Sequence, residues 1–136
     1  MYYLIQMIPP LWEGAQMTLK LFAITLLLSI PLGLILALLR LSGIKAFDVF
    51  VNGYIWLMRG TPLMLQMLFI YFALPAVGIY FEDFTAAVVA FALNYAAYFA
   101  EIFRGGILAI GRGQYEAAKT LGMSYPQTMR RIVLPQ

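Results

Sequence analysis

The stretch LFAITLLLSIPLGLILALL, residues 21–39, decides the fold class of this chain, because it contains no charged side chain. Extending it to Met17 gives the length of about 20 apolar residues that a helix needs to cross the hydrocarbon core of a bilayer. Lys20 lies near the outer end of the run and Arg40 closes it. We therefore predict a membrane-spanning helix over residues 16–40 and an all-α, polytopic membrane protein.

The composition of the whole chain agrees with this assignment. The 136 residues are 63% hydrophobic and 11% charged, with a mean hydropathy of +0.85, whereas soluble domains are roughly 25% charged. Cysteine and histidine are absent, which excludes disulfides, thiolate catalysis and the usual zinc or haem ligands. We therefore expect membrane lipid around the chain, no metal, no catalytic residues, and no nucleic-acid partner despite the net charge of +3.

Two further membrane helices are predicted downstream, over residues 61–80 and 84–110. The second span begins at Gly60-Thr61-Pro62, where Thr61 can act as the N-cap and Pro62 fits the first turn. Residues 47–59 are apolar but interrupted by polar residues and a glycine, so we interpret them as an amphipathic lead-in at the membrane interface.

The placement of basic residues predicts the orientation of the chain. Lysine and arginine surround the first loop and follow the third helix, whereas the loop between the second and third helices carries Glu82 and Asp83. By the positive-inside rule the N-terminus faces outward and the C-terminal segment faces the cytoplasm. The basic positions are 40, 45, 59, 104, 112, 119, 130 and 131.

The third predicted span has one polar and one small-residue face. Asn94, Tyr98 and Glu101 recur at helical spacing, and a stripe that permits close helix packing lies roughly opposite, at Ala92, Ala96 and Ala100. Because polar groups are costly against lipid, we hypothesise that the polar face lines a translocation path. For Glu101 the alternative is an anchoring ion pair with Arg104.

Two polar residues accompany the second span. Gln66 makes either an interhelical hydrogen bond, which is the stronger expectation, or a contact with the path. Arg59 needs no role beyond that of a positively charged anchor on the cytoplasmic side.

The last stretch, EAAKTLGMSYPQTMRRIVLP at residues 116–135, predicts two short helices joined by a glycine. Gly122 can end the first helix in a left-handed cap, and Ser124 with Gln127 fits a capping box for the second. We expect residues 112–135 to form a cytoplasmic elbow that contacts a soluble partner. The candidate contact residues are Glu116, Ala117, Ala118, Gly122, Leu134 and Pro135.

This stretch matches the EAA signature of the membrane subunits of ATP-binding-cassette importers. Three further strings narrow the resemblance to the polar amino-acid branch, of the histidine, glutamine, glutamate and arginine type. They are RGTPL at residues 59–63, followed by Gln66 and FIYF at 69–72, AYFAEIFRGG at 97–106, and GQYEAAKTLGM at 113–123. The resemblance covers the chain from about residue 16 onward and implies the MetI-like permease fold.

What the resemblance implies is a transport subunit of the bacterial cytoplasmic membrane. Two permease chains, identical or paralogous, would form the pathway, an extracytoplasmic protein would deliver the amino acid, and a dimer of ATPase subunits would dock under the elbows. ATP and magnesium would belong to the ATPase, because this chain has no G-x-x-x-x-G-K-[ST] motif. Family members continue past the elbow with further membrane helices, so we expect this sequence to be a fragment.

Two alternatives stay open from the sequence. The EAA signature also occurs in permeases for sugars, peptides, metals and oxyanions, so another solute is possible. A different class, a small helical channel or assembly protein that works without ATP, would have no use for a glycine-bent elbow.

Overall fold

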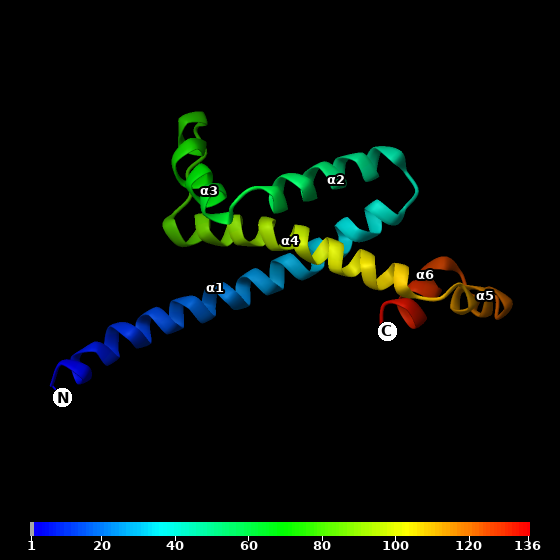
Figure 1. Cartoon of the computed structure of the whole chain (residues 1–136), viewed down its shortest axis with the longest axis horizontal. Coiled ribbons are helices and arrows are strands. Elements are labelled where there is room, and N and C mark those ends of the chain that lie inside the picture. Colours follow the sequence, from blue (N-terminus) through cyan, green and yellow to red (C-terminus); the bar gives the residue numbers. More distant parts are fainter. Residues whose placement is uncertain (1) are drawn as a thin grey trace.

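The computed structural model describes residues 2–136, except for the side chains of Tyr2 and Leu4. Every regular element in that range is helical. Figure 1 shows long helices crossing one another, with a small helical hairpin at the C-terminal end. The elements are α1 (Tyr2–Leu41), α2 (Lys45–Gly60), α3 (Leu63–Leu68), the π-helical turn η1 (Phe69–Ala73), the 3₁₀ turn η2 (Leu74–Val77), α4 (Asp83–Ala109), α5 (Arg112–Thr120), α6 (Tyr125–Thr128) and the π-helical turn η3 (Met129–Val133).

Among the described residues, two helices are long and apolar enough to cross a membrane, Ile5–Leu41 within α1 and Asp83–Ala109. The remaining candidate is a pair of helical segments, Lys45–Gly60 and Leu63–Val77, with an angle of 103° between them. Counting that bent pair as one span gives three spans. The three-helix arrangement over residues 16–40, 61–80 and 84–110 therefore stays a prediction.

Helix α1 begins earlier than expected, at Tyr2 rather than at residue 16, and continues without interruption through Pro9 and Pro10. Its side chains are exposed from Ile5 to Lys20, and the contact of Lys20 with the ring of Phe84 joins the end of this part to α4. Hydrogen bonds within the helix satisfy most of its backbone, as a segment surrounded by hydrocarbon requires, but Pro9 and Pro10 have no amide to donate to the preceding turn.

Helix α2 makes contacts within the helical body, and its expected position at the membrane interface stays a prediction. It packs along α4 and against the end of α1, with Val51 and Ile55 buried in a core shared with Leu36, Ala96 and Ala97. The hydroxyl of its Tyr54 donates a hydrogen bond to the carbonyl of Leu93 on α4. These contacts make α2 part of the helical body.

Helices α1 and α4 pack most closely at Gly33. A Cβ atom at this position would lie 2.5 Å from Cβ of Phe99 and 3.1 Å from the backbone of Ala96 and Ala100. The predicted alanine stripe of α4 is buried, and Ala96 and Ala100 meet α1 here. Small residues on both helices therefore bring the two backbones together.

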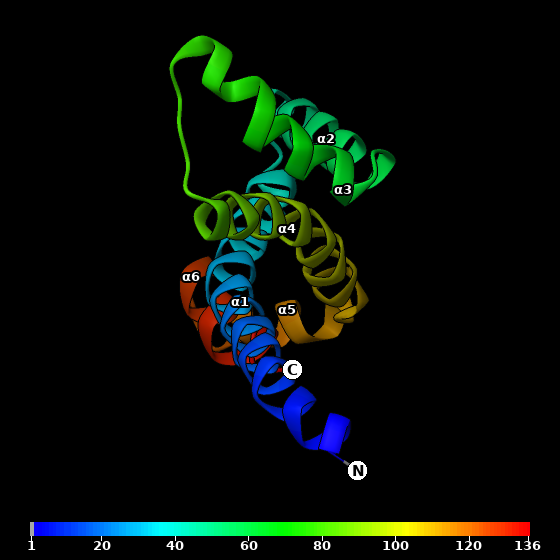
Figure 2. The same ribbon diagram turned by 90° about the vertical axis from the view of Figure 1, so that its left-hand side faces the viewer.

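A second set of small residues covers another side of α4. Ala86 and Ala90 pack against Ile70 of η1, while Ala97 faces the core shared with α2. Figure 2 shows the result, with α4 lying between α2 and α3 on one side and α1 on the other. Helix α4 is thus the central element of the chain.

Candidate functional site

The elbow is formed as the sequence predicts. Helix α5 starts two residues after α4, and its last turn is closed by hydrogen bonds from the amide of Gly122 to the carbonyl of Lys119 and from Met123 to Ala118, each 3.0 Å long. This pair of bonds is a Schellman motif, and it requires the positive φ of +72° that Gly122 adopts. Ser124 and Gln127 form the capping box that starts α6.

Burial within the elbow corrects one expectation. Ala118 is completely buried in the folded chain, so its side chain is not available for the close contact with a partner that we expected of it. Its neighbour Ala117 is exposed, as are Glu116 and the large apolar side chains of Leu121 and Tyr125. Of the other candidates, Gly122, Leu134 and Pro135 are also exposed. The exposed apolar side chains of Leu121 and Tyr125 are called the apolar knob below, and the same hairpin also exposes Glu116 and the basic residues Lys119, Arg130 and Arg131.

The sharp bend between α2 and α3 follows from Pro62. In a continuous helix the carbonyl of Met58 would accept a hydrogen bond from the amide of residue 62, but proline has none. Thr61 leaves the helical conformation, with φ −115° and ψ 145°, and its amide and hydroxyl both bond the carbonyl of Leu57. Thr61 thus closes α2 at its C-terminus and does not act as the expected N-cap of α3, which is Pro62.

Asn94 and Gln66 meet at this bend and satisfy the carbonyl that Pro62 leaves free. Asn94 Nδ2 lies 2.8 Å from the oxygen of Met58 and 3.1 Å from Oε1 of Gln66. Gln66 Nε2 lies 3.0 Å from the same Met58 oxygen and 2.7 Å from Oγ1 of Thr61. Asn94 is 4% exposed, so this face of α4 braces the α2–α3 bend, and Gln66 makes interhelical hydrogen bonds.

Tyr98 lies in a different environment from Asn94. The residue is 40% exposed, and its ring is tilted against that of Tyr95, which stacks on Phe91. The centroid of the Tyr98 ring lies 5.2 Å from the guanidinium carbon of Arg59. This distance is within cation–π range. The contact places Arg59 about midway along α4, whereas we had expected a charge at the cytoplasmic end.

Glu101 takes part in an ion-pair network and has the Arg104 partner that the sequence suggested. Its two carboxylate oxygens accept hydrogen bonds from Arg104 at 2.9 and 3.0 Å, and one of them also pairs with Arg40 of α1. Arg40 in turn lies 3.3 Å from a carboxylate oxygen of Asp48 on α2. The predicted stripe of Asn94, Tyr98 and Glu101 is therefore divided among three environments.

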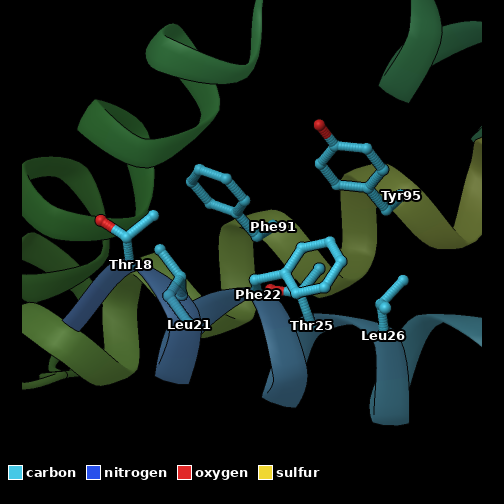
Figure 3. A pocket seen from close by; sticks show the side chains of 7 residues that line it. All are labelled: Thr18, Leu21, Phe22, Thr25, Leu26, Phe91 and Tyr95. Carbon is cyan, nitrogen blue, oxygen red and sulfur yellow. The ribbon is translucent and has the colours of Figure 1, made fainter. Parts of the chain in front are cut away.

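A cavity of about 300 Å³ lies between the middle of α1 and the N-terminal half of α4 (Figure 3). Its walls carry mainly apolar side chains, contributed by Phe22 and Leu26 from one helix and by Phe91 and Tyr95 from the other. The hydroxyl of Thr25 is buried there and has no hydrogen-bond partner among the described residues. A site of this character suits an apolar occupant better than a zwitterion.

The sequence contained partial signals for the contacts that we did not predict. Pro62 indicates a free carbonyl at Met58, because the missing amide can be read from the sequence. Nothing in the spacing of Arg40, Asp48 and Glu101 shows that they meet, since three different helices supply them.

Comparison with known proteins agrees with the elbow and the helical body. The model of the family described as "Binding-protein-dependent transport system inner membrane component" matches residues 29–136. The chain is 43% identical over 133 residues to the arginine transport system permease protein ArtQ of Bacillus subtilis (strain 168), and covers 61% of that protein. It is 38% identical over 128 residues to the L-cystine transport system permease protein TcyB of the same organism, covering 55%.

A solved structure also resembles this chain in its three-dimensional fold. The crystal structure of an amino acid ABC transporter with histidines matches 98% of this chain with a TM-score of 0.87 and 41% identity. The match covers 62% of that transporter chain. The present chain thus spans about three fifths of the length of the relatives that it matches.

Proposed function

We propose, because this chain belongs to the family of binding-protein-dependent transport system inner membrane components, that it is the membrane-spanning permease subunit of an ATP-driven amino-acid importer. Its role is to pass a polar amino acid across the bacterial cytoplasmic membrane by alternating access. The observation that carries the proposal is the elbow: a rigid, glycine-bent hairpin, joined to the central helix α4 by two residues, with its apolar knob exposed.

The proposed partner of the elbow is a separate ATPase subunit, which uses ATP and magnesium. Leu121 and Tyr125 are 78% and 63% exposed, and buried aromatic and aliphatic anchors supply most of the binding energy of protein interfaces. Glu116 and Ala117 flank this knob and complete the contact. The further proposed partners are a second permease chain and an extracytoplasmic binding protein, and the family description supports the binding protein.

The charge distribution supports a cytoplasmic elbow and an outward N-terminus. Lys20 of α1 lies over the ring of Phe84 at the start of α4, and Arg40 pairs with Glu101 near the other end, so α1 and α4 run in the same direction. The ends of both helices and the elbow therefore share one side, which carries most of the basic residues. That side faces the cytoplasm by the positive-inside rule.

For the translocation path we propose the surface around Arg59 and Tyr98. A cation held halfway along a membrane helix is costly unless it faces water or a polar cargo. Arg59 is exposed and keeps its guanidinium over the Tyr98 ring, where a zwitterion could approach it. Gln66 and Asn94 support the same region by holding the bend next to Arg59, and Glu101 lies deeper among its own ion pairs.

A cysteine-crosslinking experiment tests the elbow. The chain has no cysteine, so Ala117→Cys gives a single reactive thiol on the exposed face. In the assembled complex we expect a disulfide to a cysteine in the docking groove of the ATPase subunit, with a yield that changes on adding ATP. Ala118→Cys is the matched control, since this neighbouring position is buried and its thiol should not react. Absence of a crosslink at several groove positions would reject the proposal.

The cargo is tested separately. Arginine and cystine are named for two relatives, which favours amino acids over sugars, peptides, metals and oxyanions. Competition of unlabelled amino acids against radiolabelled arginine uptake should identify the preferred cargo. Inhibition by a sugar or an oxyanion instead would assign another solute, and uptake that is insensitive to ATP depletion would favour a channel.

A further inference from the structure

The ion pairs of Arg40 join three helices at one point. Its guanidinium pairs with Glu101 on α4 through one nitrogen and with Asp48 on α2 through another, while Arg40 itself ends α1. A guanidinium has donors fixed in a plane and can hold two carboxylates at once. The side chains of Arg40 and Glu101 are largely buried, which limits screening by solvent. The three helices are therefore tied together near their cytoplasmic ends.

Directly beyond this tie, α4 contains two adjacent glycines, Gly105 and Gly106. A Cβ atom added at either position would meet nothing within 4 Å. Close packing within the chain explains the glycine at position 33, but it does not explain Gly105 and Gly106. Each glycine weakens a helix interior by about 1 kcal/mol relative to alanine. The last turn of α4, which carries the elbow, is thus joined to the body through a weak helical segment.

We propose that Arg40 and Glu101 are positioning residues for transport: they lock α1, α2 and α4 into one body, and the elbow turns against this body at Gly105–Gly106. This inference rests on the proposed function, since it presumes that the elbow docks on an ATPase. A pivot allows the docked elbow to keep its orientation while the locked helices tilt between the two access states. The tie ensures that the three helices tilt together.

If α4 bends at Gly105–Gly106, replacing these glycines should impair transport without lowering the stability of the protein. Changing both Gly105 and Gly106 to alanine stiffens α4 without a clash and should leave thermal stability and assembly equal to or above those of the parent. The assay uses proteoliposomes that contain the complete transporter and measures the number of arginine molecules transported per ATP hydrolysed. We expect this ratio to fall about fivefold or more, which is in the range of typical coupling free energies. Gly53→Ala on α2 is the matched control, because it also adds a Cβ in open space.

The tie is tested in the same assay. Arg40→Gln should lower the transport-to-ATP ratio by a similar factor, because Asp48 on α2 and Glu101 on α4 then lose their common partner at the end of α1. Lys45→Gln removes a nearby exposed cation that forms no ion pair among the described residues, and should leave the ratio within about twofold of the parent.

An unchanged ratio in the double alanine variant or in Arg40→Gln would overturn the inference. Loss of assembly in the double alanine variant would also overturn it, because the glycines would then be a packing site for a partner. The crosslink from Ala117→Cys is measured in the parent first. Its absence there rejects the proposed function itself, whereas a normal crosslink with unchanged ratios rejects the pivot alone.

Discussion

The side-chain amide of Asn94 on α4 donates a hydrogen bond of 2.8 Å to the main-chain oxygen of Met58 on α2. That oxygen lacks its helical partner because residue 62 is proline. A polar side chain in the middle of a membrane-length helix therefore serves the backbone of a neighbouring helix. This relationship changes the expectation for Asn94 from a residue that holds cargo to one that supports the bend beside the proposed path.

Replacing Asn94 with leucine should destabilise the chain. The change leaves the Met58 carbonyl with one fewer donor and Oε1 of Gln66 without its interhelical partner, at a cost of about 1–2 kcal/mol. Thermal unfolding in detergent, followed by circular dichroism, measures the loss. Gln16→Leu removes an exposed amide of α1 and should have no comparable effect. A variant as stable as the parent that still loses transport would return Asn94 to the path.

Gly33→Ala should disrupt the packing of α1 on α4. Its new Cβ would lie 2.5 Å from Cβ of Phe99, next to backbone that cannot move away locally, and overpacking of this kind costs about 1–3 kcal/mol. The comparison is Gly14→Ala in the same helix, where the Cβ meets nothing within 4 Å and should be neutral or stabilising. Equal unfolding temperatures for the two variants would contradict the close approach of the helices.

Gly122→Ala should loosen the elbow. The left-handed conformation at φ +72° costs a residue with a Cβ about 1–2 kcal/mol, so the Schellman bonds at the end of α5 should open more often. Hydrogen exchange at the amides of residues 122 and 123 reports this directly. Gly113→Ala, at the start of α5 and in open space, is the control. Protection that survives in Gly122→Ala would show that the bend does not depend on glycine.

Arg59→Gln should reduce transport while leaving the fold intact. The side chain is exposed and contacts Tyr98 through its ring, so its removal costs little packing, but it removes the proposed anchor for the carboxylate of an amino acid. We expect an increase of about tenfold or more in the KM for uptake, equivalent to one charge-assisted hydrogen bond. Lys45→Gln supplies the comparison for loss of a cation elsewhere. Unchanged KM would remove Arg59 from the path.

Much of the chain could be predicted from local sequence. The uncharged run at residues 21–39 determines a membrane helix, and Gly122, Ser124 and Gln127 determine the elbow, because their caps bond the backbone within a few residues. The 136 residues also contain no cysteine, no histidine and no nucleotide-binding motif of the G-x-x-x-x-G-K-[ST] type. These features depend on neighbours in the sequence or on composition, which is why they need no fold to be recognised.

The tertiary structure decided which surroundings each polar residue of α4 has. Helical spacing puts Asn94, Tyr98 and Glu101 on one face of α4, but the segments packed against that face differ along its length. The tertiary structure also decided that Ala118 is buried, since the burial of one alanine depends on the neighbours that the folded chain places over it.

The sequence by itself thus determined the membrane class, the signature of the elbow and the family resemblance, because hydropathy and capping are local properties. Only the tertiary structure decided the direction of α2, the place of Arg59 halfway along α4, and the meeting of Arg40 with Asp48 and Glu101. The physical reason is that these contacts join residues up to 61 positions apart, whose approach depends on how whole helices pack.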